Sequence, residues 1–110
     1  MNPYMFVILC YPLPDNKNYD LVGGAHVHIW VMDNSLEKAQ ERAFEYIRKY
    51  SWEPQEIEHA FEIQPQQIPF LHKDEENLFL MAGQYGIAAD FLAWRKQEGQ
   101  SGDPVLIFEP

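Results

Sequence analysis

One stretch, Gly23–Met32, constrains the fold of this chain more than any other. Its residues alternate between aliphatic and ring-bearing side chains from position 25 to position 31. Successive side chains on a β-strand point to opposite faces of its sheet. The set expected to face a core is Val27, Ile29 and Val31. The set expected on the opposite face is His26, His28 and Trp30.

The remaining sequence predicts the other elements of an α+β domain. Apolar runs or alternation predict strands at 4–11 and 57–63, although the second segment also fits a short helix. Apolar residues at helical spacing predict helices at 36–50 and 74–85. These elements succeed one another without an internal repeat, so the chain is expected to form one sheet with two helices.

The C-terminal third contains one ambiguous segment. Residues Ile87–Arg95 fit either a strand or an extension of the preceding helix, and Gly86 favours the strand because glycine terminates helices in a left-handed conformation. The predicted order is β-β-α-β-α-β, with a mainly antiparallel sheet of four or five strands and both helices on one face. The arrangement is expected to be ferredoxin-like in general appearance.

Length and charge limit the classes of protein to consider. The chain has 110 residues, enough for one domain, which we place at 1–96, followed by a flexible linker and an apolar segment at 97–110. Its 17 acidic and 8 basic residues give a formal charge of −9, which repels nucleic acid and anionic membranes. The apolar N-terminal run is too short to span a bilayer and lacks the basic start of a signal peptide. A cytoplasmic location is therefore expected.

The uncovered face of the predicted sheet is a candidate surface for self-association. If both helices lie on one face, the other face exposes Trp30 beside the histidines, and a homodimer through this face or a sheet edge is expected. A flexible linker would also deliver an apolar C-terminal strand to a sheet edge. The residues predicted at such an interface are Trp30, Val105, Leu106, Ile107 and Phe108.

The same two histidines are candidate metal ligands. Imidazoles two residues apart on a strand can bind one divalent metal ion. A third ligand is expected from Glu58 or Glu62 on a neighbouring strand, or from His72, with Glu58 the preferred candidate. The spacing His-x-His is common by chance, so solvent-facing or partner-covered histidines are the favoured interpretation and no cofactor is expected. Glu58 and Glu62 are predicted to share a face of their strand.

Two further residues have ordinary structural interpretations. His59 alternates in phase with Ile57 and Phe61, so it is predicted to face the core. Cys10 is predicted to be a small buried side chain, since an acidic chain offers no electropositive setting for a thiol nucleophile.

The sequence leaves two classes of function open. The first is a small acidic interaction or regulatory module that forms a homodimer. The second is a metal- or small-ligand-binding domain, with or without enzymatic activity, that uses His26 and His28. No set of residues points to a particular reaction, so binding is favoured over catalysis.

Overall fold

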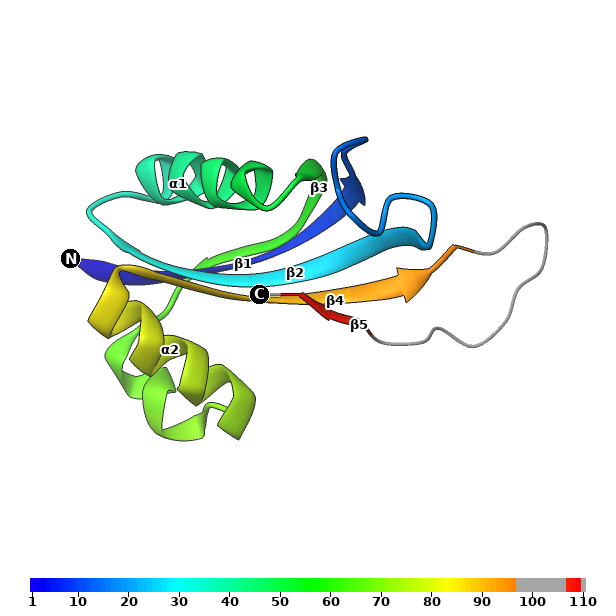
Figure 1. The fold of residues 1–110 in the computed structure, drawn as a ribbon. Helices are drawn as coiled ribbons and strands as arrows, with labels where there is room; N and C mark the ends of the chain where they lie inside the picture. Colours follow the sequence, from blue (N-terminus) through cyan, green and yellow to red (C-terminus); the bar gives the residue numbers. More distant parts are fainter. Residues whose placement is uncertain (97–106, 110) are drawn as a thin grey trace.

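The computed structural model describes residues 1–96 and 107–109, which form one sheet with helices against both faces (Figure 1). The strands are β1 (Asn2–Pro12), β2 (Val22–Asp33), β3 (Trp52–Glu62), β4 (Ile87–Arg95) and β5 (Ile107–Glu109). The helices are α1 (Leu36–Lys49), the short 3-10 helix η1 (Pro65–Phe70) and α2 (Lys73–Tyr85). The predicted α+β class and element order are confirmed, and the ambiguous segment is a strand.

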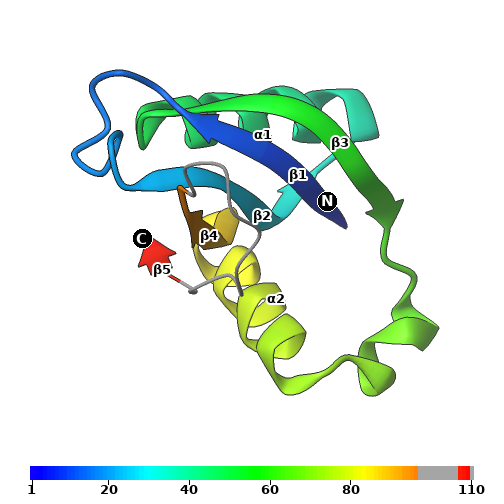
Figure 2. The ribbon, with the colours of Figure 1, turned by 90° about the vertical axis from the view of Figure 1, so that its right-hand side faces the viewer.

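The sheet is antiparallel, in the order β3-β1-β2-β4 with the short β5 beyond β4. β1 and β2 form its central pair, aligned from Asn2 opposite Asp33 to Cys10 opposite Ala25. β3 pairs with the free side of β1, and β4 pairs with the free side of β2. Figure 2 shows the chain leaving β3 at one edge, passing η1 and returning through α2 to β4. The other two long strands therefore each attach to one strand of this central pair.

The turn between α2 and β4 is fixed from two sides. Gly86 ends α2 with a φ of 87°, a conformation that residues with a Cβ resist, and its amide donates to the Ala82 carbonyl. Arg42 of α1 donates to the carbonyl oxygen of Met32 at 2.7 Å and pairs with Asp33 at 3.2 Å. The same guanidinium reaches the Gly86 carbonyl oxygen at 3.4 Å. It therefore ties α1 to the end of β2 and to the start of β4.

The two helices lie on opposite faces of the sheet, so the prediction that both cover one face is wrong (Figure 1). α1 buries Ala39, Ala43 and Ile47 against one face. α2 buries Leu78 and Ala82 against the other face, at the end where β2 finishes. The amphipathic pattern of a helix shows which side of the helix is buried, but it does not show which sheet face receives it.

The placement of α2 changes the role of Trp30. Val27, Ile29 and Val31 are fully buried on the α1 side, as the alternation predicts. Trp30 points the other way but is only 1% exposed, because α2 covers it and Phe79 contacts its ring edge-on at 6.0 Å between centroids. The expectation that Trp30 lies on an uncovered face is therefore wrong.

A β-bulge in β3 changes which side chains face which side. The pairing with β1 slips by one residue between Ile57 and His59, which leaves Glu58 as the extra residue. Ile57 packs in the core beneath α1, whereas the exposed His59 turns to the opposite face and stacks on Phe61 at 5.7 Å. The prediction that His59 faces the core is wrong, because simple alternation assumes that no residue is inserted.

The bulge also separates the two glutamates that were predicted to share a face. Glu62 lies opposite Tyr4, on the α1 side, and accepts a hydrogen bond from the Tyr4 hydroxyl at 3.1 Å. Glu58 instead reaches His26 on the other face. The shared-face prediction is therefore wrong for the same reason as that for His59.

The C-terminal part is described only for Ile107–Glu109, which pairs with Phe91–Ala93 of β4. The predicted linker at 97–103 and the predicted interface residues Val105 and Leu106 lie outside the described residues. The other predicted residues of that segment, Ile107 and Phe108, belong to β5. Across residues 1–96 and 107–109, no helix is long and apolar enough to cross a membrane.

Replacing Trp30 by alanine is expected to lower the free energy of unfolding by about 3–5 kcal/mol, because the cavity between β2 and α2 would not collapse fully. Urea unfolding followed by circular dichroism measures this change. A loss below about 1 kcal/mol would mean that α2 does not cover the ring.

Candidate functional site

The sheet face opposite α1 carries two rows of side chains across the four long strands. Residues directly opposite each other in antiparallel strands share a face. From β3 to β4, the first row is His59, Val7, His28 and Asp90. The second row is Glu56, Leu9, His26 and Leu92. The histidines of β2 are thus on one face, as predicted, and α2 covers the neighbouring row that contains Trp30.

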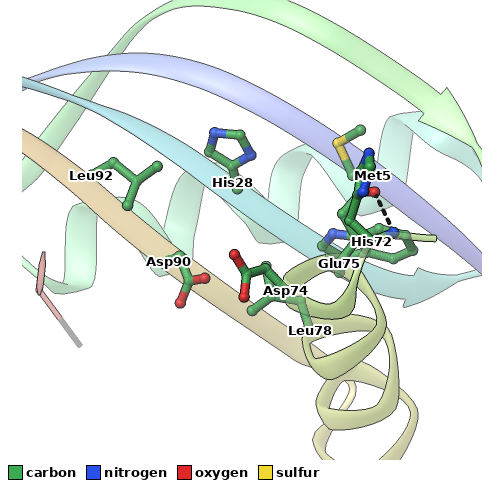
Figure 3. Close-up of a pocket in the computed structure, with 9 residues that line it drawn as sticks. Met5, His28, His72, Asp74, Glu75, Leu78, Asp90 and Leu92 are labelled. Carbon is green, nitrogen blue, oxygen red and sulfur yellow. Dashed lines mark hydrogen bonds between the residues drawn. The ribbon is translucent and has the colours of Figure 1, made fainter.

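A cleft of about 590 Å³ lies between the first row and the start of α2 (Figure 3). Four apolar side chains line it: Met5, Trp30, Leu78 and Leu92. Five titratable side chains join them: His28, His72, Asp74, Glu75 and Asp90. Small-molecule sites are usually about 300–1,000 Å³ with apolar walls and a few polar groups, and the cleft meets this description.

His28 contributes one of the two imidazoles of the cleft, from the centre of the sheet (Figure 3). Burial lowers its pKa below the ordinary 6.5, and the negative charge of Asp90 opposes this effect only in part. The positive charge that His26 can carry lowers the pKa of His28 further. His28 is therefore neutral at pH 7, with one ring nitrogen able to donate and the other able to accept a hydrogen bond.

Three carboxylates make the cleft electrostatically negative. Asp90 is half-buried on β4, and neither it nor Asp74 has a hydrogen bond or ion pair from its carboxylate to another residue of the described ranges. Glu75 accepts a hydrogen bond from the His72 backbone amide at 3.0 Å (Figure 3). Lys73, which begins α2, does not line the cleft. The field inside it therefore favours a positively charged group.

Asp90 and Asp74 are site residues that the sequence reasoning missed. Asp90 is the one polar residue in the otherwise apolar run Ile87–Trp94, and a carboxylate in such a strand is a signal that could have been noticed. Asp74 gave no such signal, because acidic residues are common in the first turn of a helix. Their meeting in one cleft depends on α2 lying on the face away from α1.

Two of the three predicted metal ligands are neighbours. His26 Nδ1 and Glu58 Oε1 are 2.7 Å apart, and the side chains meet above β1 because Glu58 follows the core-facing Ile57 and so points to the opposite face. His28 lines the cleft instead. Within the residues that the structure describes, no three His, Cys, Asp or Glu side chains are grouped to hold a metal ion. Metal binding by His26, His28 and Glu58 stays a prediction, with two of its side chains brought together.

Trp94 explains the two glycines that precede the histidines. A Cβ on Gly23 would lie 2.6 Å from the Trp94 indole nitrogen, and a Cβ on Gly24 would lie 2.5 Å from a ring carbon. The indole therefore lies directly over this part of β2, where it also contacts the His26 ring at 5.1 Å between centroids. The glycines make room for a ring rather than for a phosphate.

The remaining nucleophile candidate is inert. Cys10 is fully buried in the core, as predicted. Burial raises the pKa of its thiol to about 12, and the negative charges of Glu53 and Glu58 add to this effect. The thiol therefore stays protonated at neutral pH.

Comparison with protein-family models, with curated proteins and with solved structures gives no match. The geometry and electrostatics of the cleft and its surroundings therefore indicate what the domain can bind.

Replacing Gly24 by alanine is expected to displace the Trp94 indole and to destabilise the fold by about 1–3 kcal/mol, since the new Cβ would also lie 3.0 Å from the Cys10 carbonyl oxygen. The matched control is Gly83→Ala in α2, where a Cβ would meet nothing within 4 Å. That change is expected to be stabilising by up to about 1 kcal/mol through helix propensity. Equal effects on the urea midpoint would contradict the proposed packing.

The lowered pKa of His28 predicts a pH-dependent stability. Between the folded-state pKa and 6.5, the unfolded chain binds the proton more readily, so the free energy of unfolding falls as the pH drops through this window. Wild type is expected to lose more stability than His28→Gln between about pH 7.5 and about pH 5. Parallel urea-unfolding profiles for the two proteins would show that His28 is not desolvated.

Proposed function

We propose that this domain binds a small organic cation, an amine or guanidinium with an apolar body, in the cleft between the sheet and α2. The observation that carries the proposal is the half-buried Asp90 carboxylate, which has no hydrogen bond or ion pair within the described residues and lies beside a neutral His28. Removing a carboxylate from water is unfavourable unless a positive or hydrogen-bonding group compensates it. A bound cation would supply that compensation.

Different residues of the cleft lining would contact the charged part and the apolar part of such a ligand. The positive group would lie between Asp90 and Asp74, and the charge-assisted hydrogen bonds it makes there are the strong kind. The apolar body would pack against Leu78 and Leu92, which line the same cleft. His28 would hydrogen-bond a neutral polar group of the ligand. This proposal corresponds to the second class of function that the sequence left open, a small-ligand-binding domain.

The net charge of the chain supports a cationic rather than an anionic ligand. A formal charge of −9 attracts cations over distances of about a Debye length and speeds their association. The three acidic residues in the first turn of α2, Asp74, Glu75 and Glu76, also offset the positive end of that helix. An anion would therefore meet repulsion at this helix end.

Calorimetric titration with phenethylamine and with agmatine tests the proposal, using uncharged 2-phenylethanol as the matched control ligand. We expect the two cations to bind and the alcohol to bind at least about tenfold more weakly, because it lacks the charge-assisted hydrogen bonds. Chemical-shift changes should include the amides of His28 and Asp90.

Two variants of the protein test whether the cations bind in the cleft. Asp90→Asn is expected to weaken cation binding by about 1.5 kcal/mol, or about tenfold in Kd. Asp20→Asn removes one charge from the exposed connection between β1 and β2, away from the cleft, and is expected to leave Kd nearly unchanged. If both variants weaken binding equally, the cations are attracted only by net charge and the proposed site is wrong.

A further inference from the structure

Beyond the cleft, the same sheet face continues into a second surface, which we call the open strip. Its members are Val7, Leu9, His26, Glu56, Glu58, His59 and Trp94. α2 lies at one end of this face and does not extend over the strip (Figure 1). None of these residues is fully buried, in contrast to the opposite face, where α1 covers a continuous core. None of the helices that the structure describes therefore covers this strip.

The centre of the strip is apolar and held in place. Val7 and Leu9 share this face of β1, and Leu9 lies opposite His26 on β2. The Trp94 ring lies over the glycines of β2, next to His26. The His26 ring contacts Trp94, and the Glu58 carboxylate in turn holds His26 at 2.7 Å. A half-buried tryptophan fixed in this way presents a large contact area at little entropic cost, as in the energetic centres of protein interfaces.

The rim of the strip along β3 is acidic. Glu56 is exposed on β3 and its carboxylate has no hydrogen bond or ion pair within the described residues, and the Glu58 carboxylate lies 2.7 Å from His26. Arg48 of α1, which reaches β3, is paired there with Glu53 at 3.1 Å. A partner with basic residues around an apolar centre would complement this pattern.

We propose that the open strip docks a basic amphipathic helix of a partner protein. Its apolar side would lie on Val7, Leu9 and Trp94, and its lysine or arginine side chains would reach Glu56 and Glu58. A helix is the layer that complements an uncovered sheet face, as α1 does on the other side. A second copy of this chain fits less well, because a two-fold interface would bring the same acidic rim against itself.

The test uses a synthetic peptide of about four helical turns, with leucine on one face and lysine on the other. Two control peptides keep its length, one with glutamate for lysine and one with the same composition in scrambled order. Full-length protein is titrated with each peptide and followed by the Trp94 indole signal in ¹H–¹⁵N spectra. Binding of the amphipathic basic peptide alone, with shifts at Val7, Leu9 and Trp94, is the expected result.

Charge-reversal variants decide whether the strip itself binds. Glu56→Lys with Glu58→Lys is expected to weaken peptide binding at least about tenfold. The matched control, Glu41→Lys with Glu45→Lys on the exposed side of α1, changes the net charge equally and is expected to alter the affinity less than about twofold. Unchanged circular dichroism spectra of both variants establish that each remains folded.

Four results would overturn the proposal. Equal losses in the two double variants would mean that only net charge attracts the peptide. Shifts centred on the exposed Leu80 and Met81 of α2 would place binding on that helix instead. A dimer in sedimentation equilibrium that Leu9→Asn dissociates would make a second copy the occupant. Binding that appears only after deletion of residues 97–110 would make the chain's own C-terminal segment the occupant.

Discussion

The antiparallel pairing of β1 with β2 positions all the other strands of the sheet. Nine aligned residue pairs hold these strands together, and β3 and β4 each attach to one of them. β2 is central, and helices lie against both faces of the sheet. Val27 and Ile29 face α1, and Trp30 faces α2. His26 and His28 lie on the same face as Trp30, beyond the row that α2 buries. The cleft and the open strip both follow from this division of one strand.

The extra residue at Glu58 in β3 changes the facing of the side chains that follow it in the strand. Without the bulge, His59 would share the α1 side with Ile57, since alternate residues of a strand point to the same face. With it, His59 joins Glu58 on the face of the β2 histidines, where Glu58 pairs with His26 and His26 contacts Trp94. Bulges commonly redirect side chains near functional sites, and this one brings a histidine to the strip beside an acidic residue.

The cleft and the open strip are both lined by acidic side chains. Within the part of the chain that the structure describes, carboxylates without a hydrogen bond or ion pair line both, at Asp90 in the cleft and at Glu56 on the strip. The His28 imidazole between them is kept neutral by burial, which lowers its pKa. The guanidinium of Arg42 is used internally, on the carbonyl of Met32 and on Asp33, and so does not neutralise either surface. A chain with this distribution of charge is suited to positively charged ligands and partners.

The sequence by itself determined the α+β class, the order of the elements, the core-facing side of β2 and the end of α2 at Gly86, because these depend on local periodicity and backbone preference. Only the tertiary structure decided the rest. The face chosen by α2 buried Trp30 and formed the cleft with Asp90, and the bulge at Glu58 reversed the facing of His59. Both are long-range outcomes: amphipathicity does not specify which face a helix covers, and alternation does not reveal where a strand gains a residue.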